Sequence, residues 1–168
     1  ILKAIPMPRT DHAIVLDAID RRILAELQAD GRLSNLDLSK RVHLSPTPCL
    51  NRVRRLEKAR VILGYRAIIE PKAIDAELLV LVQIVLDRTT PAVFDDFARA
   101  VKTMPEVLEC LMVSGGFDYL IKARVKDMAA YRDFLGKTLV RLPSVRETHS
   151  YVVMERVKDT TVIPVPGV

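Results

Sequence analysis

The stretch LSPTPCLNRVRRLEK, residues 44–58, constrains the fold more than any other feature, because it fixes where a helix begins. The first backbone N–H groups of a helix have no acceptor within it, so Pro46 and Pro48 can stand in the first turn at little cost. Pro48 also disfavours helical geometry at Thr47, which leaves Ser45 and Thr47 as candidates for the N-cap. Either way, the sequence predicts a stiffly started helix with an exposed N-terminus.

The helix after these prolines is predicted to be apolar along one narrow stripe and basic elsewhere. Leu50, Val53 and Leu56 form the expected inward stripe. The net charge of the chain is +5, and residues 1–71 hold 13 lysines and arginines against 8 acids, whereas residues 72–168 hold 13 of each. A local excess of this kind is typical of a protein that binds a polyanion, although a charged helix can also be a merely solvated face.

Two shorter helical patterns precede the basic helix. Apolar residues recur at helical spacing from Leu16 to Leu27, with Asp17 as the predicted N-cap and Asp30-Gly31 as the stop. Ser34 is the predicted cap of a second helix that ends near Val42. Short helices joined by tight turns, the last one basic, are typical of a helix-turn-helix whose recognition helix enters the major groove of DNA. The alternative is the corner of an ordinary three-helix bundle.

The residues after the basic helix favour DNA binding. Residues 61–71, VILGYRAIIEP, predict two short strands, Val61-Ile62 and residues 65–69, around a turn at Leu63-Gly64. Such a wing beside a basic helix indicates a winged helix-turn-helix. The residues expected to face DNA are Ser45, Thr47, Pro48, Asn51, Arg52, Arg54, Arg55 and Lys58.

The second half of the chain alternates strands and helices in a different order. The patterns predict, in sequence, a strand at 78–87, a helix ending near 104, strands at 107–114 and 118–125, a helix at 127–141 and a strand within 145–157. This βαββαβ order predicts an α+β protein with a ferredoxin-like sandwich, helices on one face of the sheet. Val82 and Val152 lie in strands that are apolar on both sides, so the open face is expected to be covered by a second copy of the chain.

The sequence gives little support to an enzyme, a metal site or a membrane protein. Cys49 and Cys110 lie far apart, and His12, His43 and His149 are scattered, so no disulfide framework, zinc site or catalytic group is indicated. No apolar run approaches the roughly 18 residues of a membrane span, and the first ten residues do not resemble a signal peptide. We expect a cytoplasmic, nucleoid-associated protein without cofactor or metal.

Several motifs together resemble the Lrp/AsnC family of leucine-responsive and asparagine-responsive transcription regulators. They are LDAIDRRILAELQADGR, LSKRV, LSPTPCLNRVRRLE, SGGFDYL and LPSVRETHSYVVMERV, and the likeness spans about Leu16 to Lys158. The resemblance implies a DNA-binding domain, a ferredoxin-like effector domain, homodimers through the sheet faces and tetramers of dimers. The expected divisions are an N-terminal arm (1–13), the winged helix-turn-helix (14–70), a linker (71–77), the effector domain (78–158) and a C-terminal tail (159–168).

The sequence departs from the family pattern at three glycine-related positions. His43 and Arg60 stand where the family commonly has glycine, and if both keep a positive φ, Arg60 costs about 1 kcal/mol. Gly116 stands where an acidic residue is common, which loosens the turn that carries it.

That turn, from Gly115 to Tyr119, is the predicted effector site. Its glycines let backbone N–H groups face an α-carboxylate, while Asp118 offers a carboxylate to an α-ammonium group. Apolar neighbours are expected to select leucine or another branched or sulfur-bearing amino acid. The predicted set is Leu111, Gly115, Gly116, Phe117, Asp118, Tyr119, Met128, Val140, Tyr151 and Val152. The alternative is a plain hairpin turn in which Asp118 is a local cap.

Two other functions compete with an amino-acid-responsive regulator. An architectural DNA-binding protein would share the DNA-binding half and ignore amino acids. A regulatory amino-acid-binding subunit of an enzyme would share the effector half and lack salt-sensitive binding to DNA.

Overall fold

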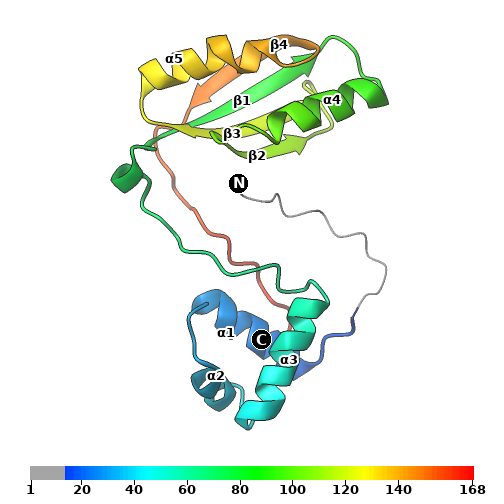
Figure 1. The fold of residues 1–168 in the computed structure, drawn as a ribbon, viewed down its shortest axis with the longest axis vertical. Helices are drawn as coiled ribbons and strands as arrows, with labels where there is room; N and C mark the ends of the chain where they lie inside the picture. Colours follow the sequence, from blue (N-terminus) through cyan, green and yellow to red (C-terminus); the bar gives the residue numbers. More distant parts are fainter. Residues whose placement is uncertain (1–13) are drawn as a thin grey trace. The chain divides into compact units, whose positions relative to one another are not determined.

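The computed structural model describes residues 14–168, so the predicted N-terminal arm and His12 lie outside the described residues. The chain divides into two compact units (Figure 1). The first extends to Ile68 and also includes Lys158–Val168, while the second is Ile69–Val157. The chain thus leaves the first unit, forms the second and returns.

The first unit is built on three helices, α1 (Ala18–Ala29), α2 (Asn35–Arg41) and α3 (Pro46–Lys58). The predicted caps of the first two are confirmed: Asp17 accepts a hydrogen bond from the Asp20 N–H, and Ser34 accepts one from the Asp37 N–H. Ser45 is the N-cap of α3, but its side chain makes no cap hydrogen bond. Thr47 lies inside the helix, so the alternative cap is wrong.

Positive φ angles end both α2 and α3, as the family resemblance implied. His43 has φ 57° and Arg60 has φ 60°. After α3, the N–H of Arg60 donates to Glu57 O and that of Val61 to Leu56 O, the paired bonds of a Schellman motif. The same pattern follows α2 at His43. Both joints therefore keep the geometry that glycine favours, and side chains are tolerated there.

The predicted wing strands are wrong. Residues 61–70 contain no strand. The N–H groups of Val61 and Ile62 both donate to Leu56 O, so these two residues complete the end of α3 rather than pair with residues 65–69. Their side chains pack against the core of the first unit.

The core of the first unit consists of five buried residues from its three helices, namely Ile23, Leu38, Val42, Cys49 and Leu56. On α3 the inward stripe is Cys49, Val53 and Leu56, and the prediction of Leu50 was wrong. Because an α-helix turns about 100° per residue, Leu50 lies at the edge of this stripe. It is half-buried and outside the core cluster.

The C-terminal tail is part of the first unit and not a separate segment. Gln28 of α1 bonds twice to the backbone of Ile163, donating from Nε2 to its oxygen at 2.8 Å and accepting its N–H at 2.8 Å. Arg21 donates to Pro166 O at 3.0 Å. These polar contacts hold the tail to α1, although Ile163 itself stays exposed.

The second unit has the predicted βαββαβ order. Its elements are a 3₁₀ helix η1 (Pro71–Ile74), β1 (Leu78–Leu86), α4 (Pro91–Val101), β2 (Val107–Met112), β3 (Tyr119–Val125), α5 (Met128–Lys137), η2 (Leu139–Arg141) and β4 (Val145–Val152). The expected linker 71–77 is thus partly helical. The last predicted helix stops at Lys137, because Thr138 leaves helical geometry (φ −122°, ψ −64°).

All strand pairs in the sheet are antiparallel, in the order β2-β3-β1-β4. Helices α4 and α5 cover one face (Figure 1). Alternate residues of β1 and β3 are buried beneath them: Val80, Val82, Ile84, Leu86, Tyr119, Ile121, Ala123 and Val125. The predicted α+β class is therefore confirmed: a helix-turn-helix unit, without the predicted wing strands, is followed by a ferredoxin-like unit.

The opposite face of the sheet carries no helix and has an apolar centre. Leu81 and Val85 alternate with the buried residues of β1 and so point to this face. Leu81 is directly opposite Tyr151, which also donates a hydrogen bond to Gln83 at 3.3 Å. The sequence prediction named Val82 and Val152 for the open face, and this was wrong. Val82 lies in the core beneath the helices, and Val152 is directly opposite Val80, which points to that helix-covered face too.

Candidate DNA-binding and effector sites

The exposed side of α3 is a polar stripe opposite the buried one. Thr47, Asn51, Arg54 and Lys58 follow each other at intervals of four, three and four residues, so they lie along one line of the helix. All four are exposed. Ser45 and Pro48 are exposed at the start of the same helix. Within the described chain, Arg54 and Lys58 form no ion pair, which leaves both cations available to a ligand.

The other two arginines of α3 are engaged inside the protein. Arg52 Nη1 contacts Asp17 Oδ2 at 2.6 Å and Asp20 Oδ1 at 2.9 Å, and Arg55 Nη2 contacts Asp20 Oδ2. The Asp20 side chain is fully buried, whereas that of Arg52 is 28% exposed and that of Arg55 is 47% exposed. The structure therefore separates the predicted DNA-facing arginines into a free one and a paired set.

The sequence analysis missed Asp20. Its signal was present, because Asp17 and Asp20 stand three residues apart at a helix start, the spacing of a capping box. The Asp20 carboxylate accepts the Asp17 N–H at 3.1 Å. The hydrogen bond from the Asp20 N–H and that from Arg52 hold the pKa of Asp17 at about 2. The capping box thus orients the Asp17 and Asp20 side chains within α1, independently of their contacts with the arginines of α3.

The acid of the basic stretch, Glu57, is also satisfied within the unit. Tyr65 donates its hydroxyl to Glu57 at 3.1 Å, and burial together with this bond raises the pKa of Tyr65 to about 12. Tyr65 was predicted as a strand residue, but it lies outside any strand and its hydroxyl is bonded to Glu57 near the end of α3.

The predicted effector turn joins β2 to β3 at one end of the sheet of the second unit. Gly115 has φ 152°, and a Cβ added at Gly115 or Gly116 would meet no atom within 4 Å, so the turn is open to solvent. Within residues 14–168, no backbone carbonyl accepts a hydrogen bond from the N–H groups of residues 114–117. These donors are therefore available to an anion.

Asp118 is partly committed to holding the turn on the sheet. Its Oδ2 accepts the N–H of Leu86 at 2.8 Å, while its own N–H donates to Ile84 O at 2.9 Å. The Asp118 side chain therefore ties the turn to β1 across 32 residues of sequence, which is not the local cap within the turn that the alternative interpretation expected. Its second oxygen, Oδ1, makes none of these bonds.

Tyr119 does not line an open site. It is 4% exposed and belongs to the core under α4. Its ring stacks on Phe97 with centroids 4.4 Å apart and meets Phe94 edge-on at 6.1 Å. The Tyr119 side chain therefore anchors the end of the turn in the core, and Phe117 is half-buried.

The apolar residues predicted around the effector do not meet within one chain. Leu111 lies on β2 and Tyr151 on β4, the two edges of the sheet, separated by three strand spacings or about 14 Å. Val152 pairs with Val80 towards the other end of β1, four residues or about 13 Å along the strand from Ile84, the partner of Tyr119, and Met128 also lies at that end beside Leu78. All of these residues except the turn itself are substantially exposed: Leu111, Met128, Val140, Tyr151 and Val152.

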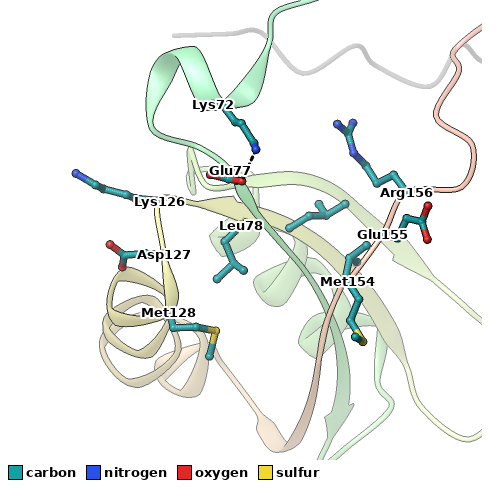
Figure 2. A pocket seen from close by; sticks show the side chains of 11 residues that line it. Lys72, Glu77, Leu78, Lys126, Asp127, Met128, Met154, Glu155 and Arg156 are labelled. Atoms are coloured by element: carbon teal, nitrogen blue, oxygen red, sulfur yellow. Dashed lines mark ion pairs between the residues drawn. The ribbon is translucent and has the colours of Figure 1, made fainter.

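A shallow pocket of about 460 Å³ lies at the far end of the second unit (Figure 2). Met128 and Met154 point into it, and Lys72 and Glu77 form an ion pair at 3.0 Å on its rim. Of the predicted effector residues, Met128 alone lines this pocket. The glycine turn thus lies at one end of the sheet, and the pocket, which is lined by both charged and apolar side chains, lies at the other end.

Within the described part of the chain, no three His, Cys, Asp or Glu side chains are grouped to hold a metal ion. No helix among residues 14–168 is both long and apolar enough to span a bilayer.

An exposed polar helix at the end of a helix-turn-helix, combined with a ferredoxin-like unit, defines a DNA-binding transcription regulator with a ligand-binding domain. Residues 16–57 match the AsnC-type helix-turn-helix domain, and residues 79–163 match the Lrp/AsnC ligand binding domain. The chain belongs to the Lrp/AsnC family of transcription regulators.

Individual relatives support the same assignment over most of the chain. The leucine-responsive regulatory proteins of Haemophilus influenzae and of Escherichia coli K12 are both 60% identical over 145 residues, which span 86% of this chain and 87% and 88% of those proteins. A transcriptional regulator of Neisseria meningitidis, solved as its L-Met complex, has a TM-score of 0.86 at 38% identity and covers 90% of this chain and 98% of its own. The leucine response regulatory protein LrpA of Mycobacterium tuberculosis has a TM-score of 0.76 at 33% identity, covering 90% and 100%.

Proposed function

We propose that this regulator reads double-stranded DNA with the exposed stripe of α3 and that a leucine-like amino acid controls its assembly and its affinity for DNA. The observation that carries the first part is the stripe of Thr47, Asn51, Arg54 and Lys58, in which neither cation pairs with an acid among residues 14–168. Arginine and asparagine are the side chains that make bidentate contacts to guanine and adenine in the major groove. Arg54 and Asn51 are therefore our candidates for base readout.

The start of α3 supplies the remaining DNA contacts. Ser45, Thr47 and Pro48 lie at a helix N-terminus, where the helix dipole and the free N–H groups favour a phosphate. Lys58 is placed at the other end of the stripe and suits a second phosphate. A two-fold dimer presents two such helices, so two half-sites about one helical turn apart, or a multiple of it, are needed.

Self-association through the open sheet face is the second part of the proposal. The face exposes Leu111 and Tyr151 around the half-buried Leu81, Val85 and Leu120. An apolar sheet face without a covering layer favours pairing with an identical face, which gives a two-fold dimer. Further association of four dimers follows from the family resemblance alone.

The effector part rests on the turn and on the relatives. The unpaired N–H groups of residues 114–117 suit an α-carboxylate, and Asp118 Oδ1 suits an α-ammonium. The curated relatives are named for a response to leucine, and the Neisseria meningitidis structure is an L-Met complex. The family resemblance implies a pocket between subunits, and the separation of Leu111 and Tyr151 at opposite edges of one sheet is compatible with residues that reach it from different chains.

The remaining assignments follow from this role. The protein acts in the cytoplasm, associated with the nucleoid, and it has no catalytic activity and needs no metal or cofactor. An architectural protein that ignores amino acids is the competing function, and the open glycine turn with its free N–H groups argues against it.

A thermal-shift screen against the twenty amino acids, followed by fluorescence anisotropy on duplex DNA, tests the proposal. A bound amino acid at 100 times its Kd stabilises the protein by about 2.7 kcal/mol, which gives a clear shift. Leucine, methionine or another branched amino acid should raise the melting temperature and change DNA affinity. If no amino acid does either while DNA still binds, the architectural function is correct.

A further inference from the structure

The buried carboxylate of Asp20 divides the cations of α3 into two pairs. Arg52 and Arg55 are bonded to it, whereas Arg54 and Lys58, within the described residues, meet no acid. Asp20 lies on α1 and the two arginines on α3, so the contacts also cross-link the two helices. A fully buried acid is costly unless it is paired and hydrogen-bonded, and here two guanidinium groups and the Asp17 N–H satisfy it.

We propose that Asp20 is a specificity-determining residue that holds Arg52 and Arg55 back from the DNA phosphates. The inference rests on the proposed DNA-binding surface, and it assigns a role to a residue that does not itself touch DNA. Asp17 assists by holding Arg52 at 2.6 Å. Of the four cations of α3, only Arg54 and Lys58 then face the DNA, and the other two are paired with acids of α1.

The reason lies in how charge and sequence contribute to binding. Each phosphate neutralised by a lysine or arginine adds affinity for any sequence and steepens the salt dependence, by about 0.9 in the slope of log K against log salt. Base contacts add affinity for the correct sequence alone. An arginine that is paired with Asp20 makes neither phosphate nor base contacts. The ratio of specific to non-specific affinity is therefore higher than it would be if all four cations of α3 were free.

The pairing also fixes the rotation of α3 about its own axis. Arg52 and Arg55 lie on the flank of the helix between the buried stripe and the exposed one, since they are one and four residues beyond Asn51. Bonds from this flank to one buried group on α1 resist a roll of the helix in either direction. Asn51 and Arg54 are therefore held at a constant angle to the groove.

The experiment compares Asp20→Asn and Asp17→Asn with the wild-type full-length protein. Binding is measured across a range of KCl on two duplexes of equal length, one selected by the wild type from a random library and one of random sequence. Asp17→Asn keeps an N-cap acceptor, because asparagine caps helices as well as aspartate, so this variant should fold even if Asp20→Asn does not. Glu26→Gln is the matched control, since Glu26 is an acid of α1 that pairs with Arg41 of α2.

Freed arginines should strengthen binding to the random duplex. The salt slope on that duplex should steepen by up to about 1 for Asp17→Asn and up to about 2 for Asp20→Asn. The ratio of specific to non-specific affinity should fall about tenfold for Asp20→Asn, while Glu26→Gln leaves both quantities near the wild-type values. Because Asp20 still holds Arg52 in Asp17→Asn, the decisive variant is Asp20→Asn. The inference is overturned if a folded Asp20→Asn keeps the wild-type slope and ratio, or if affinity for both duplexes falls in parallel in either variant. A wild type without salt-dependent binding to any duplex overturns the proposed function itself.

Discussion

The two units of this chain differ in how much of their function one copy contains. The DNA-binding unit is complete: its caps, its joints, its core and its polar stripe come from contacts between neighbouring helices. The effector unit has a complete core but an uncovered sheet face, and its candidate site residues lie at opposite ends and edges of the sheet. Residues at helical spacing share one face of a single helix, so one chain is enough to form that binding surface. A pocket formed by several strands depends instead on how the sheets of different chains pack together. One unit can therefore be altered residue by residue, and the other should respond first to changes in assembly.

The largest effect is expected from a charge placed on the open sheet face. Leu81→Asp puts a carboxylate at the centre of the face, where pairing with a second copy would remove it from water together with the neighbouring Lys122 of β3, at a cost in free energy that the leucine does not have. The protein should become monomeric at micromolar concentration, as measured by light scattering. Ile74→Asp, an equal change at an exposed residue of η1, should keep the wild-type mass. A Leu81→Asp protein of unchanged mass would show that the sheet faces do not form the interface.

Alanine substitutions on α3 should separate the two kinds of arginine. Arg54→Ala should weaken binding to the selected duplex by about 1–3 kcal/mol and leave stability unchanged, because Arg54 contacts no acid. Arg52→Ala should instead lower the free energy of unfolding by about 1–3 kcal/mol, because Asp20 then loses a charged hydrogen bond in a buried position. Urea unfolding and anisotropy on the same samples measure both quantities. Equal losses of stability for the two variants would contradict this division.

Asp118 is expected to act in two ways that a pair of variants distinguishes. Asp118→Asn keeps an oxygen for the Leu86 N–H but removes the charge, so it should keep the fold and lower amino-acid affinity about 10-fold or more. Asp118→Ala should lose affinity and also some stability, since the Leu86 N–H is left without its side-chain acceptor. Calorimetric titration of leucine and methionine checks the first effect and thermal unfolding the second. Unchanged affinity in both variants would leave Asp118 with a structural role alone.

The smallest effect concerns acid stability. The Asp17 carboxyl has a folded pKa of about 2, below its ordinary value near 4, so its contribution is fully present above about pH 4 and is lost as the pH falls through 2. Asp17→Asn removes this titration and should therefore flatten the dependence of stability on pH between about 4 and 2. Thermal unfolding at several pH values compares the variant with wild type. If the two curves stay parallel over that range, the bonds from Asp20 N–H and Arg52 do not act on the folded state as described.

The features that could be predicted from the sequence are those set by neighbours along the chain. Prolines at 46 and 48 and caps at Asp17 and Ser34 follow from local geometry, and these are confirmed. The positive φ angles at His43 and Arg60 occur where the family resemblance places glycine. The strand and helix order of the second unit is equally local. These signals were sufficient to define both units and their family.

The failures concern contacts between residues distant in sequence. The wing was predicted from β-prone residues, but the N–H groups of Val61 and Ile62 were already used by the end of α3. Arg52 and Arg55 looked like free cations because nothing in the sequence shows that Asp20 is buried between them. Tyr119 was assigned to a binding site, whereas its ring belongs to the core with Phe97. The effector residues are an extreme case, since one chain does not bring them together.

Calorimetric titration of leucine into the monomeric Leu81→Asp variant tests the central difference between the two units most directly. The DNA-binding unit is complete in one chain, so its folding should be unchanged, as shown by the far-UV circular dichroism of its helices. Under the proposed function the effector site requires a second chain, so the variant is expected to show no heat of leucine binding, whereas wild type binds at the same concentration. A folded monomer that binds leucine with wild-type affinity would place the whole effector site within one chain and contradict this account.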